Sequence, residues 1–366
     1  MAPIPRSRPL KKNDFPTFFK PLKPTVFSDL PPNIRGPPLP PNIRALSWSP
    51  TGSLIATSTS ADIRVWTSER PNVKNSTQLK SAHAKGGVPY GSPGIGGDTV
   101  EKVAFCPTVE GVLASTGLDG MVRLWDVRTP GAVTGVGGKG TPALADCRTG
   151  GDSAFLTWHP DGKELLVGRR DDVVHAVDVR RMDGGVRYEM FHEKKMERGK
   201  HVLYAMAFSN SGREVLATTQ EGSVRILDWP SMEYLHTLAG HTAAAYTVGH
   251  SPVGAHIAIG SGDSTISLWD TTTWLSTHTL SAPSQTTSVR DLSFSFDGAY
   301  IVAGAGPDAK DGMPGLNIFH ADHGSVVHTV ETTHCPSYVA WHPTRYWLAY
   351  AGDTGGMKVI GAGTVL

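Results

Sequence analysis

Short strand-like stretches recur along the chain, and each ends in a bulky residue that is followed by a turn. They are too short for helices and are separated by residues such as Asn, Asp, Gly and Pro, which favour turns. The bulky residues are Trp48, Phe105, Trp158, Phe208, His250, Phe294 and Trp341. Successive members lie between 42 and 57 residues apart. A spacing of this size predicts a repeated unit of several short strands.

A second pattern follows the bulky residues: an acidic turn residue and, six positions later, an apolar residue that is often followed by Asp. The full copies are Asp119 with Trp125, Asp171 with Val177, Glu221 with Leu227, Asp263 with Trp269, and Asp353 with Val359. Six positions span a tight turn plus about half a strand, so the two residues can lie in neighbouring strands of one sheet. Each repeat is therefore expected to be a four-stranded antiparallel sheet.

One such sheet cannot cover both of its own faces, so neighbouring sheets must do so. Seven sheets stacked around an axis solve this problem, and the sequence predicts an all-β, seven-bladed β-propeller over residues 25–366. Because the last repeat lacks room for a fourth strand, residues 25–30 are expected to supply it, with Thr25-Val26-Phe27 as the strand. Residues 1–24 are expected to be a basic, proline-rich, disordered tail whose first 20 residues are dispensable for folding.

Four ranges between the strand patterns are rich in glycine or charge, and we expect them to be loop insertions: 69–98, 129–151, 181–200 and 305–315. The second contains a GxGxxG string at 135–140, but no strand-to-helix unit surrounds it, so a flexible loop is the better interpretation. Within 189–201, opposite charges three and four residues apart indicate an exposed helix face. The basic residues there and in the tail also suit contact with RNA or an acidic partner, although no aromatic residues are interleaved.

Composition narrows the function classes. The net charge is +1, from 34 Lys+Arg and 33 Asp+Glu, which argues against a duplex-DNA binder with a basic field over the whole domain. Three cysteines without a CxxC pair argue against a disulfide framework or a structural zinc site and favour a reducing compartment. Neither a signal peptide nor a run of 18 apolar residues occurs, so we expect no membrane association and a cytosolic or nuclear protein.

Known catalytic motifs are absent from the sequence: there is no GxSxG, HExxH or P-loop pattern. An enzyme, a cofactor and a metal site are therefore not expected. His159 and His342 both occur in Trp-His-Pro, which favours a role in a turn. His320, His323 and His328 lack the acidic or cysteine neighbours of a typical metal site.

Repeat symmetry predicts a binding face. Residues four positions before each bulky residue share one place in every repeat, at the start of the innermost strand and on the rim of the central channel. They are Arg44, Glu101, Ala154, Tyr204, Tyr246, Arg290 and Ser337. The residues before three turn acids, Leu118, Arg170 and Gln220, are expected on the same face. Arg and Tyr are enriched at binding hot spots, which favours a protein-binding face over merely exposed strand ends.

The fifth repeat resembles the WD-repeat propeller family. Gly240-His241, Ser261, Asp263 and Trp269 match that family's motif, and the resemblance implies that His241, Ser261, Asp263 and Trp269 form a buried hydrogen-bond tetrad. The second repeat keeps His83, Asp119 and Trp125.

Longer strings, in order over about 42–360, are similar to the family of third subunits of the THO complex. They are Gly-Arg-Arg-Asp-Asp-Val-Val-His-Ala-Val-Asp at 168–178, Ser-Val-Arg-Asp-Leu-Ser-Phe-Ser-Phe-Asp-Gly at 288–298 and Tyr-Val-Ala-Trp-His-Pro-Thr-Arg-Tyr-Trp-Leu-Ala-Tyr at 338–350. This resemblance implies a nuclear, non-enzymatic scaffold in transcription-coupled mRNA packaging and export. The implied partners are other THO subunits, especially the large helical one, and indirectly a DEAD-box RNA helicase and an mRNA export adaptor.

An alternative stays open at this point. Trp125-Asp126-Val127-Arg128 resembles the WDxR box with which some propellers dock onto the adaptor of a cullin-based ubiquitin ligase. Under that interpretation the protein is a substrate receptor of such a ligase. The same letters also arise from ordinary strand-and-turn chemistry within a blade.

Overall fold

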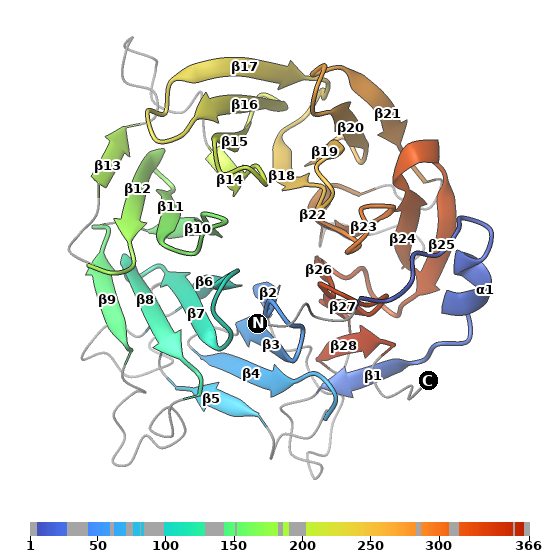
Figure 1. Cartoon of the computed structure of the whole chain (residues 1–366), viewed down its shortest axis with the longest axis horizontal. Helices are drawn as coiled ribbons and strands as arrows, with labels where there is room; N and C mark the ends of the chain where they lie inside the picture. Colours follow the sequence, from blue (N-terminus) through green and yellow to red (C-terminus); the bar gives the residue numbers. More distant parts are fainter. Residues whose placement is uncertain are drawn as a thin grey trace.

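A computed structural model describes residues 6–27, 43–58, 62–70, 76–80, 82–83, 99–128, 143–150, 152–181, 186–189, 203–282, 287–306, 315–353 and 356–361. Within these residues the strands form seven four-stranded antiparallel sheets around one axis (Figure 1). The predicted all-β, seven-bladed propeller is thereby confirmed. No helix of the described residues is both long and apolar enough to cross a membrane.

The blades follow one another along the chain, each running from its innermost to its outermost strand. Blades one to three comprise β2 (Ala45–Trp48), β3 (Leu54–Ser58), β4 (Ile63–Thr67), β5 (Thr77–Leu79); β6 (Val100–Phe105), β7 (Val112–Gly117), β8 (Met121–Asp126), β9 (Ala145–Arg148); and β10 (Ser153–Trp158), β11 (Glu164–Arg169), β12 (Val173–Asp178), β13 (Val186–Glu189). The predicted bulky residues are the last residues of the innermost strands.

The remaining blades repeat this arrangement. Blades four to six comprise β14 (Leu203–Phe208), β15 (Glu214–Thr219), β16 (Ser223–Asp228), β17 (Tyr234–Ala239); β18 (Ala245–His250), β19 (His256–Ser261), β20 (Ile266–Asp270), β21 (Ser276–Leu280); and β22 (Val289–Phe294), β23 (Tyr300–Ala305), β24 (Gly315–His320), β25 (Val326–Glu331). A 3-10 helix, η3 (Ala321–His323), follows β24. Blade seven comprises β26 (Tyr338–Trp341), β27 (Leu348–Ala351), β28 (Met357–Ile360) and β1 (Pro24–Phe27).

Three of the ranges predicted to be insertions contain outermost strands. β5 lies within 69–98, β9 within 129–151 and β13 within 181–200, so the interpretation of these whole ranges as loops is wrong. The outermost strands escape detection because one of their faces is open to water, and β9, for example, alternates exposed and buried positions. The GxGxxG string at 135–140 and positions 190–201 of the charged segment lie outside the described residues.

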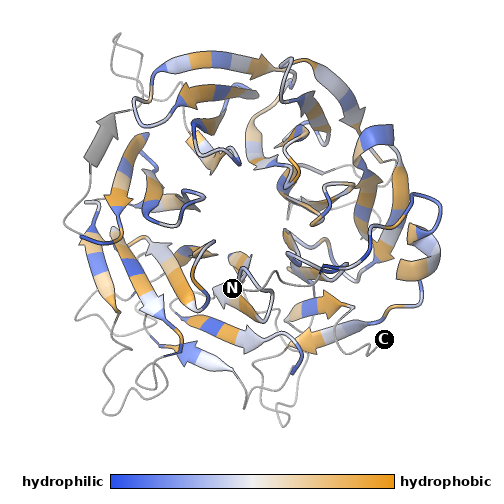
Figure 2. Cartoon of the chain, viewed as in Figure 1, coloured by the Kyte–Doolittle hydropathy of each residue, from blue (hydrophilic) through white to orange (hydrophobic). Residues whose placement is uncertain are grey.

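The core lies between blades. Each buried hydrophobic cluster combines residues from two neighbouring sheets; one, for example, joins Val65 of blade one to Phe105 and Trp125 of blade two. Hydrophobic positions alternate with polar ones along many strands (Figure 2). Each sheet therefore gains the cover that it cannot give itself, which is the physical reason for the ring.

The ring is closed by the start of the chain. β1 pairs antiparallel with β28, and Thr25 lies opposite Val359. Phe27 is buried at the junction with blade one, where its ring lies 5.7 Å from that of Trp66. The strand at Thr25-Val26-Phe27 is therefore present as the fourth strand of blade seven.

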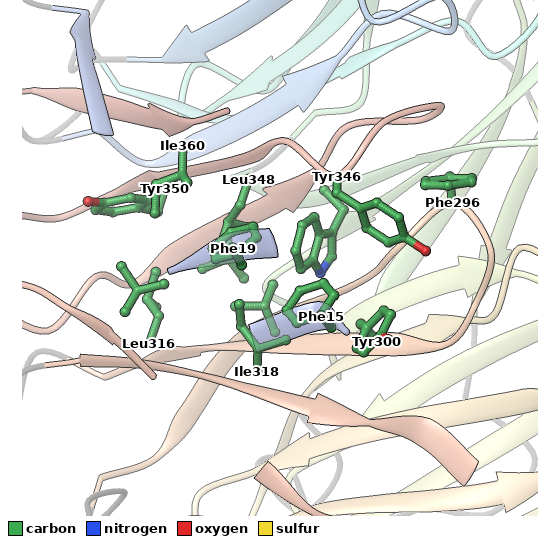
Figure 3. Close-up of a cluster of buried hydrophobic side chains, with 14 residues drawn as sticks. Phe15, Phe19, Phe296, Tyr300, Leu316, Ile318, Tyr346, Leu348, Tyr350 and Ile360 are labelled. Carbon is green, nitrogen blue, oxygen red and sulfur yellow. The ribbon is translucent and has the colours of Figure 1, made fainter. Parts of the chain in front are cut away.

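Residues before β1 differ from the disordered tail that the sequence suggests. Helix α1 (Phe15–Phe19) lies beside β25, and Phe15 and Phe19 are fully buried between blades six and seven (Figures 1 and 3). The Phe15 ring stacks on Tyr300 at 4.0 Å. The described part of this segment is thus packed against the propeller, because its phenylalanines match an aromatic surface that composition alone does not reveal.

Candidate functional site

Five of the predicted rim residues occupy β-bulges at the start of the innermost strands. Glu101, Ala154, Tyr246 and Arg290 are each the extra residue where the pairing register with the next strand shifts. Tyr204 lies in the corresponding irregularity between Leu203 and Met206. A bulge redirects the side chain that it carries, so these residues share one orientation in the ring. We call this surface the axial rim.

The two other predicted members lie directly before strands. The Arg44 N–H donates to Ser58 O at 3.1 Å just before β2, and the Ser337 N–H donates to Ala351 O at 3.0 Å just before β26. Both positions therefore continue the inner ladder of their blades at the same end as the bulges.

Glu101 links three blades at the axial rim. Arg44 Nη1 of blade one lies 2.7 Å from Glu101 Oε1, and Arg170 Nη2 of blade three lies 3.7 Å from Glu101 Oε2. The Glu101 side chain is only 13% exposed, whereas the Arg170 side chain is 57% exposed. The negative charge of Glu101 is therefore balanced by arginines within the protein, while more than half of the Arg170 side chain is exposed to solvent.

An aromatic group continues the axial rim through blades four to six. The rings of Tyr204 and Tyr246 meet edge to face with centroids 4.8 Å apart. The Arg290 guanidinium lies over the Tyr246 ring at 3.8 Å. Cation–π stacking of this kind holds an arginine in place.

Sequence reasoning missed the next layer, which is one residue further along three of the same strands. Lys102 Nζ lies 5.7 Å from the centroid of the Tyr338 ring. Asp291 accepts hydrogen bonds from the N–H groups of Val339 and Leu292, both at 3.0 Å. Burial raises the pKa of Asp291 to about 6, an effect that the Lys102 charge opposes. The repeat register could have revealed this layer, because its residues come one position after the predicted rim residues of the same strands.

The residues before the turn acids lie at the same end of the strands. The Leu118 N–H donates to Thr99 O at 3.2 Å, and the Arg170 N–H donates to Asp152 O at 3.1 Å. Gln220 is exposed just after β15. The Arg170 side chain meets another predicted rim residue, since its Nη2 lies 3.7 Å from Glu101 Oε2.

The tetrad of blade five differs from the predicted set in one residue. His241 Nδ1 lies 2.9 Å from Asp263 Oδ2, but His241 Nε2 meets Ser267 Oγ at 2.7 Å, and Trp269 Nε1 donates to the same oxygen at 2.8 Å. Ser261 instead donates to Ala243 O. The prediction of Ser261 as a tetrad member is therefore wrong, and Ser267 takes its place.

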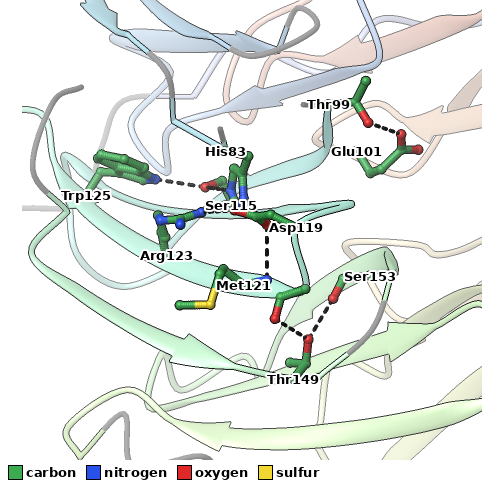
Figure 4. Close-up of polar contacts among 11 residues, drawn as sticks. His83, Thr99, Glu101, Ser115, Asp119, Met121, Arg123, Trp125, Thr149 and Ser153 are labelled. Atoms are coloured by element: carbon green, nitrogen blue, oxygen red, sulfur yellow. Dashed lines mark hydrogen bonds and ion pairs between the residues drawn. The ribbon is translucent and has the colours of Figure 1, made fainter. Parts of the chain in front are cut away.

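Blade two shows the arrangement that the sequence only partly indicated (Figure 4). His83 Nδ1 lies 2.8 Å from Asp119 Oδ1, His83 Nε2 meets Ser115 Oγ at 2.7 Å, and Trp125 Nε1 donates to Ser115 Oγ at 2.8 Å. Burial lowers the pKa of His83, which favours the neutral ring. This network ties the turn to two strands and has a structural role.

The WDxR string of blade two has a local explanation. Arg128 donates from Nε and Nη2 to the two carboxylate oxygens of Asp126, at 3.0 and 2.9 Å. Blade three contains the same fork between Arg180 and Asp178 without a tryptophan. The Asp–Arg pair is therefore a feature of the turn after the third strand in both blades.

The histidines noted in the sequence also have structural surroundings. His159 Nε2 donates to Gly212 O at 3.1 Å, and His342 Nδ1 accepts the N–H of Thr344 at 3.1 Å, as befits turn residues. His320 and His323 are neighbours, whereas the ring of His328 packs against Phe19.

Comparison with known proteins agrees with this architecture. The family model "WD domain, G-beta repeat" matches residues 35–67, 95–126, 232–270 and 274–313. The crystal structure of the Myceliophteria thermophila Cps50 (Swd1) β-propeller domain has a TM-score of 0.70 and 18% identity, and the match covers 90% of this chain and 99% of that one. This likeness shows the fold.

Two curated relatives extend over most of the chain. The WD repeat-containing protein AAC3 of Dictyostelium discoideum is 28% identical over 334 residues, covering 84% of this chain and 61% of that protein. THO complex subunit 3 of Arabidopsis thaliana is 30% identical over 312 residues, covering 85% of this chain and 86% of that protein. The chain therefore belongs to the family of THO complex subunit 3, within the WD-repeat β-propellers.

Proposed function

We propose that this protein is a non-enzymatic scaffold subunit of a nuclear THO complex, and that it supports transcription-coupled mRNA packaging and export through protein–protein contacts. The observation that carries this proposal is the similarity to THO complex subunit 3 over 85% of this chain and 86% of that protein. Its partners are then the other THO subunits, above all the large helical subunit, and through them a DEAD-box RNA helicase and an mRNA export adaptor.

The axial rim is the proposed partner-binding face, formed by Arg44, Glu101, Leu118, Arg170, Tyr204, Tyr246 and Arg290. Its support is physical. Arg290 and Tyr246 are held by mutual stacking and Arg44 by its ion pair, so little side-chain entropy is lost when a partner binds. Arginine and tyrosine are also the residue types that most often dominate binding energy.

Exchange of Arg44, Tyr204, Tyr246 and Arg290 for alanine tests this face. These side chains are partly exposed, and pairs of this kind contribute about 0–1 kcal/mol each, so the variant is expected to melt close to the wild type. In a purification from nuclear extract, the wild-type protein is expected to recover the large THO subunit and the variant to lose most of it. Quantitative immunoblotting of that subunit gives the readout.

A matched control places the same number of changes at the other ends of the strands. Lys163, Arg180 and Arg181 are exposed there, and their exchange for alanine together with Arg213→Ala is expected to leave recovery unchanged. Recovery of wild-type amounts by the rim variant would move the interface elsewhere on the propeller. Recovery of a cullin adaptor in place of THO subunits by the wild-type protein would contradict the proposed function itself.

A further inference from the structure

The turns after the innermost strands show how blades seal against each other at the face opposite the axial rim. In several of these turns a glycine is covered by a side chain of the preceding blade. A β-carbon built on the glycine would lie 2.0 to 2.5 Å from that side chain at Gly52 with His342, Gly162 with Thr108, Gly212 with His159, and Gly298 with Ser251. These junctions are therefore filled by the protein itself.

The junction between blades four and five is open instead. A β-carbon on Gly254 would find no atom closer than Asn210 Nδ2 at 3.9 Å and His250 Cε1 at 4.0 Å. Ser209 follows the innermost strand of blade four, where blades three and seven have His159 and His342. A pocket of about 290 Å³ lies at this junction.

A single carboxylate gives this pocket its charge. Glu214 is the only acidic residue among the described residues of the lining, which also includes His250. Ser209 and Ser211 both donate to its Oε2, the latter at 2.8 Å, so that Oε1 keeps its full acceptor capacity. Across the part of the chain that the structure describes, no cation lies within ion-pair distance of Glu214.

The opposite wall adds a second acceptor and an aromatic surface. His250 Nδ1 donates to Ser251 O at 3.2 Å, which leaves Nε2 of the neutral ring as an acceptor, and burial lowers the pKa of this ring. Trp274 also lines the pocket and has φ +57°, a left-handed conformation that is strained for a bulky side chain. Met232 has φ +58° at the same place in blade four, so this conformation belongs to the turn before the outermost strand.

An exposed apolar residue is adjacent in sequence to the pocket lining. Leu275 follows Trp274 and is 66% exposed. A large exposed apolar side chain of this kind suits contact with a flanking residue of a bound segment.

We propose that the pocket between blades four and five binds an arginine side chain from an extended segment of a protein partner. Glu214 Oε1 and His250 Nε2 are acceptors, so they suit a ligand with several N–H groups. The carboxylate favours a cation, and the Trp274 ring offers a surface on which a guanidinium stacks. β14 and β18 are six residues long, so this pocket lies about 20 Å from the axial rim. It is a second binding site and does not depend on the THO assignment.

A peptide titration of the full-length, ¹⁵N-labelled protein tests this proposal. The probe is acetyl-Leu-Arg-Leu-amide, and its control contains citrulline, which keeps the shape of arginine without the charge. The Trp274 indole resonance, assigned with Trp274→Phe, is expected to shift in a saturable way with the arginine peptide. Binding of the citrulline peptide is expected to be at least about tenfold weaker, since an ionic hydrogen bond is lost.

Variants locate the site. Glu214→Gln is expected to weaken binding of the arginine peptide at least about tenfold. Ser209→His fills the pocket as blades three and seven fill theirs, and is expected to abolish the shift while the protein stays folded. Glu164→Gln changes the corresponding residue of blade three and is expected to leave affinity unchanged. The proposal would be overturned if the Trp274 resonance does not shift with the arginine peptide. It would also be overturned if the resonance shifts equally with the citrulline peptide, or if it still shifts in Ser209→His.

Discussion

At the scale of single residues, blade five shows that a hydrogen-bond network can be kept when one of its side chains is supplied by a different strand. In blade two the tetrad hydroxyl comes from Ser115, which pairs across the sheet with Arg123. The corresponding pair in blade five is Ile259 and Ser267, with the hydroxyl on the other strand. Directly paired residues point to the same face of a sheet, so Ser267 reaches the same place.

This arrangement makes Ser267 more important than its place outside the motif indicates. Ser267→Ala is expected to remove the hydroxyl that joins His241 Nε2 to the Trp269 N–H and to cost about 1–3 kcal/mol. Asp263→Ala is expected to cost a similar amount. Urea midpoints measure both, with Ser276→Ala, an exposed position on β21, as the control. Midpoints equal to that of the control would mean that this tetrad adds nothing to stability.

A second residue-scale prediction concerns pH. Burial of His342, followed by the nearby Arg345 charge, lowers its pKa from 6.5 to about 4. Above pH 6.5 neither state binds the proton. Between pH 6.5 and 4 the unfolded chain binds it and the folded chain does not, so stability falls as pH falls, by about 3 kcal/mol in total.

The test compares the wild type with His342→Asn, whose amide oxygen retains an acceptor for the turn. Between pH 7 and pH 5 the variant is expected to lose about 2 kcal/mol less than the wild type in urea unfolding. Equal losses in the two proteins would show that His342 does not titrate as its burial implies.

At the scale of elements, the segment before β1 is an integral part of the propeller. Leu10 is fixed by two tyrosines: its N–H donates to Tyr346 Oη and its carbonyl accepts from Tyr300 Oη, both at 2.9 Å. Together with the burial of Phe15 and Phe19, these bonds replace the expectation that residues 1–20 are dispensable. The segment covers aromatic rings that would otherwise face solvent.

Removal of residues 1–20 is therefore expected to lower the free energy of unfolding by about 2–4 kcal/mol, because burial of each phenylalanine contributes about 1.5–3 kcal/mol and ordering of the segment opposes part of it. Phe15→Ala with Phe19→Ala is expected to reproduce most of the loss. Thr17→Ala with Lys20→Ala, both exposed, is the matched control. A truncated protein as stable as the full chain would mean that the segment does not dock in solution.

At the scale of the whole molecule, closure couples the first strand to the last blade. Every core cluster is shared by two blades, and β1 joins the two ends of the chain. A ring of this kind has no blade that can open without exposing the core of its neighbours. The match of the WD-repeat family model at 232–270 also extends over two blades, since it combines β17 of blade four with three strands of blade five.

Removal of residues 1–30 is expected to destabilise all seven blades together, because it leaves the outer edge of β28 without its partner strand and exposes the cluster that Phe27 covers. Far-UV circular dichroism and near-UV signals of the tryptophans are expected to report one coincident, lowered transition. An early transition confined to one signal would mean that blades six, seven and one unfold separately from the rest.

The sequence by itself determined the repeat, the number of blades, the strand that closes the ring and the register of the axial rim. These features depend on the spacing of hydrophobic residues and on local turn chemistry, and both can be seen directly in the sequence. The packing of α1, the exchange of Ser261 for Ser267, the layer of Lys102, Asp291 and Tyr338, and the pocket beside Glu214 were decided by the tertiary structure alone. Each depends on which side chain of one blade meets another element, and residues that far apart in sequence carry no spacing signal to each other.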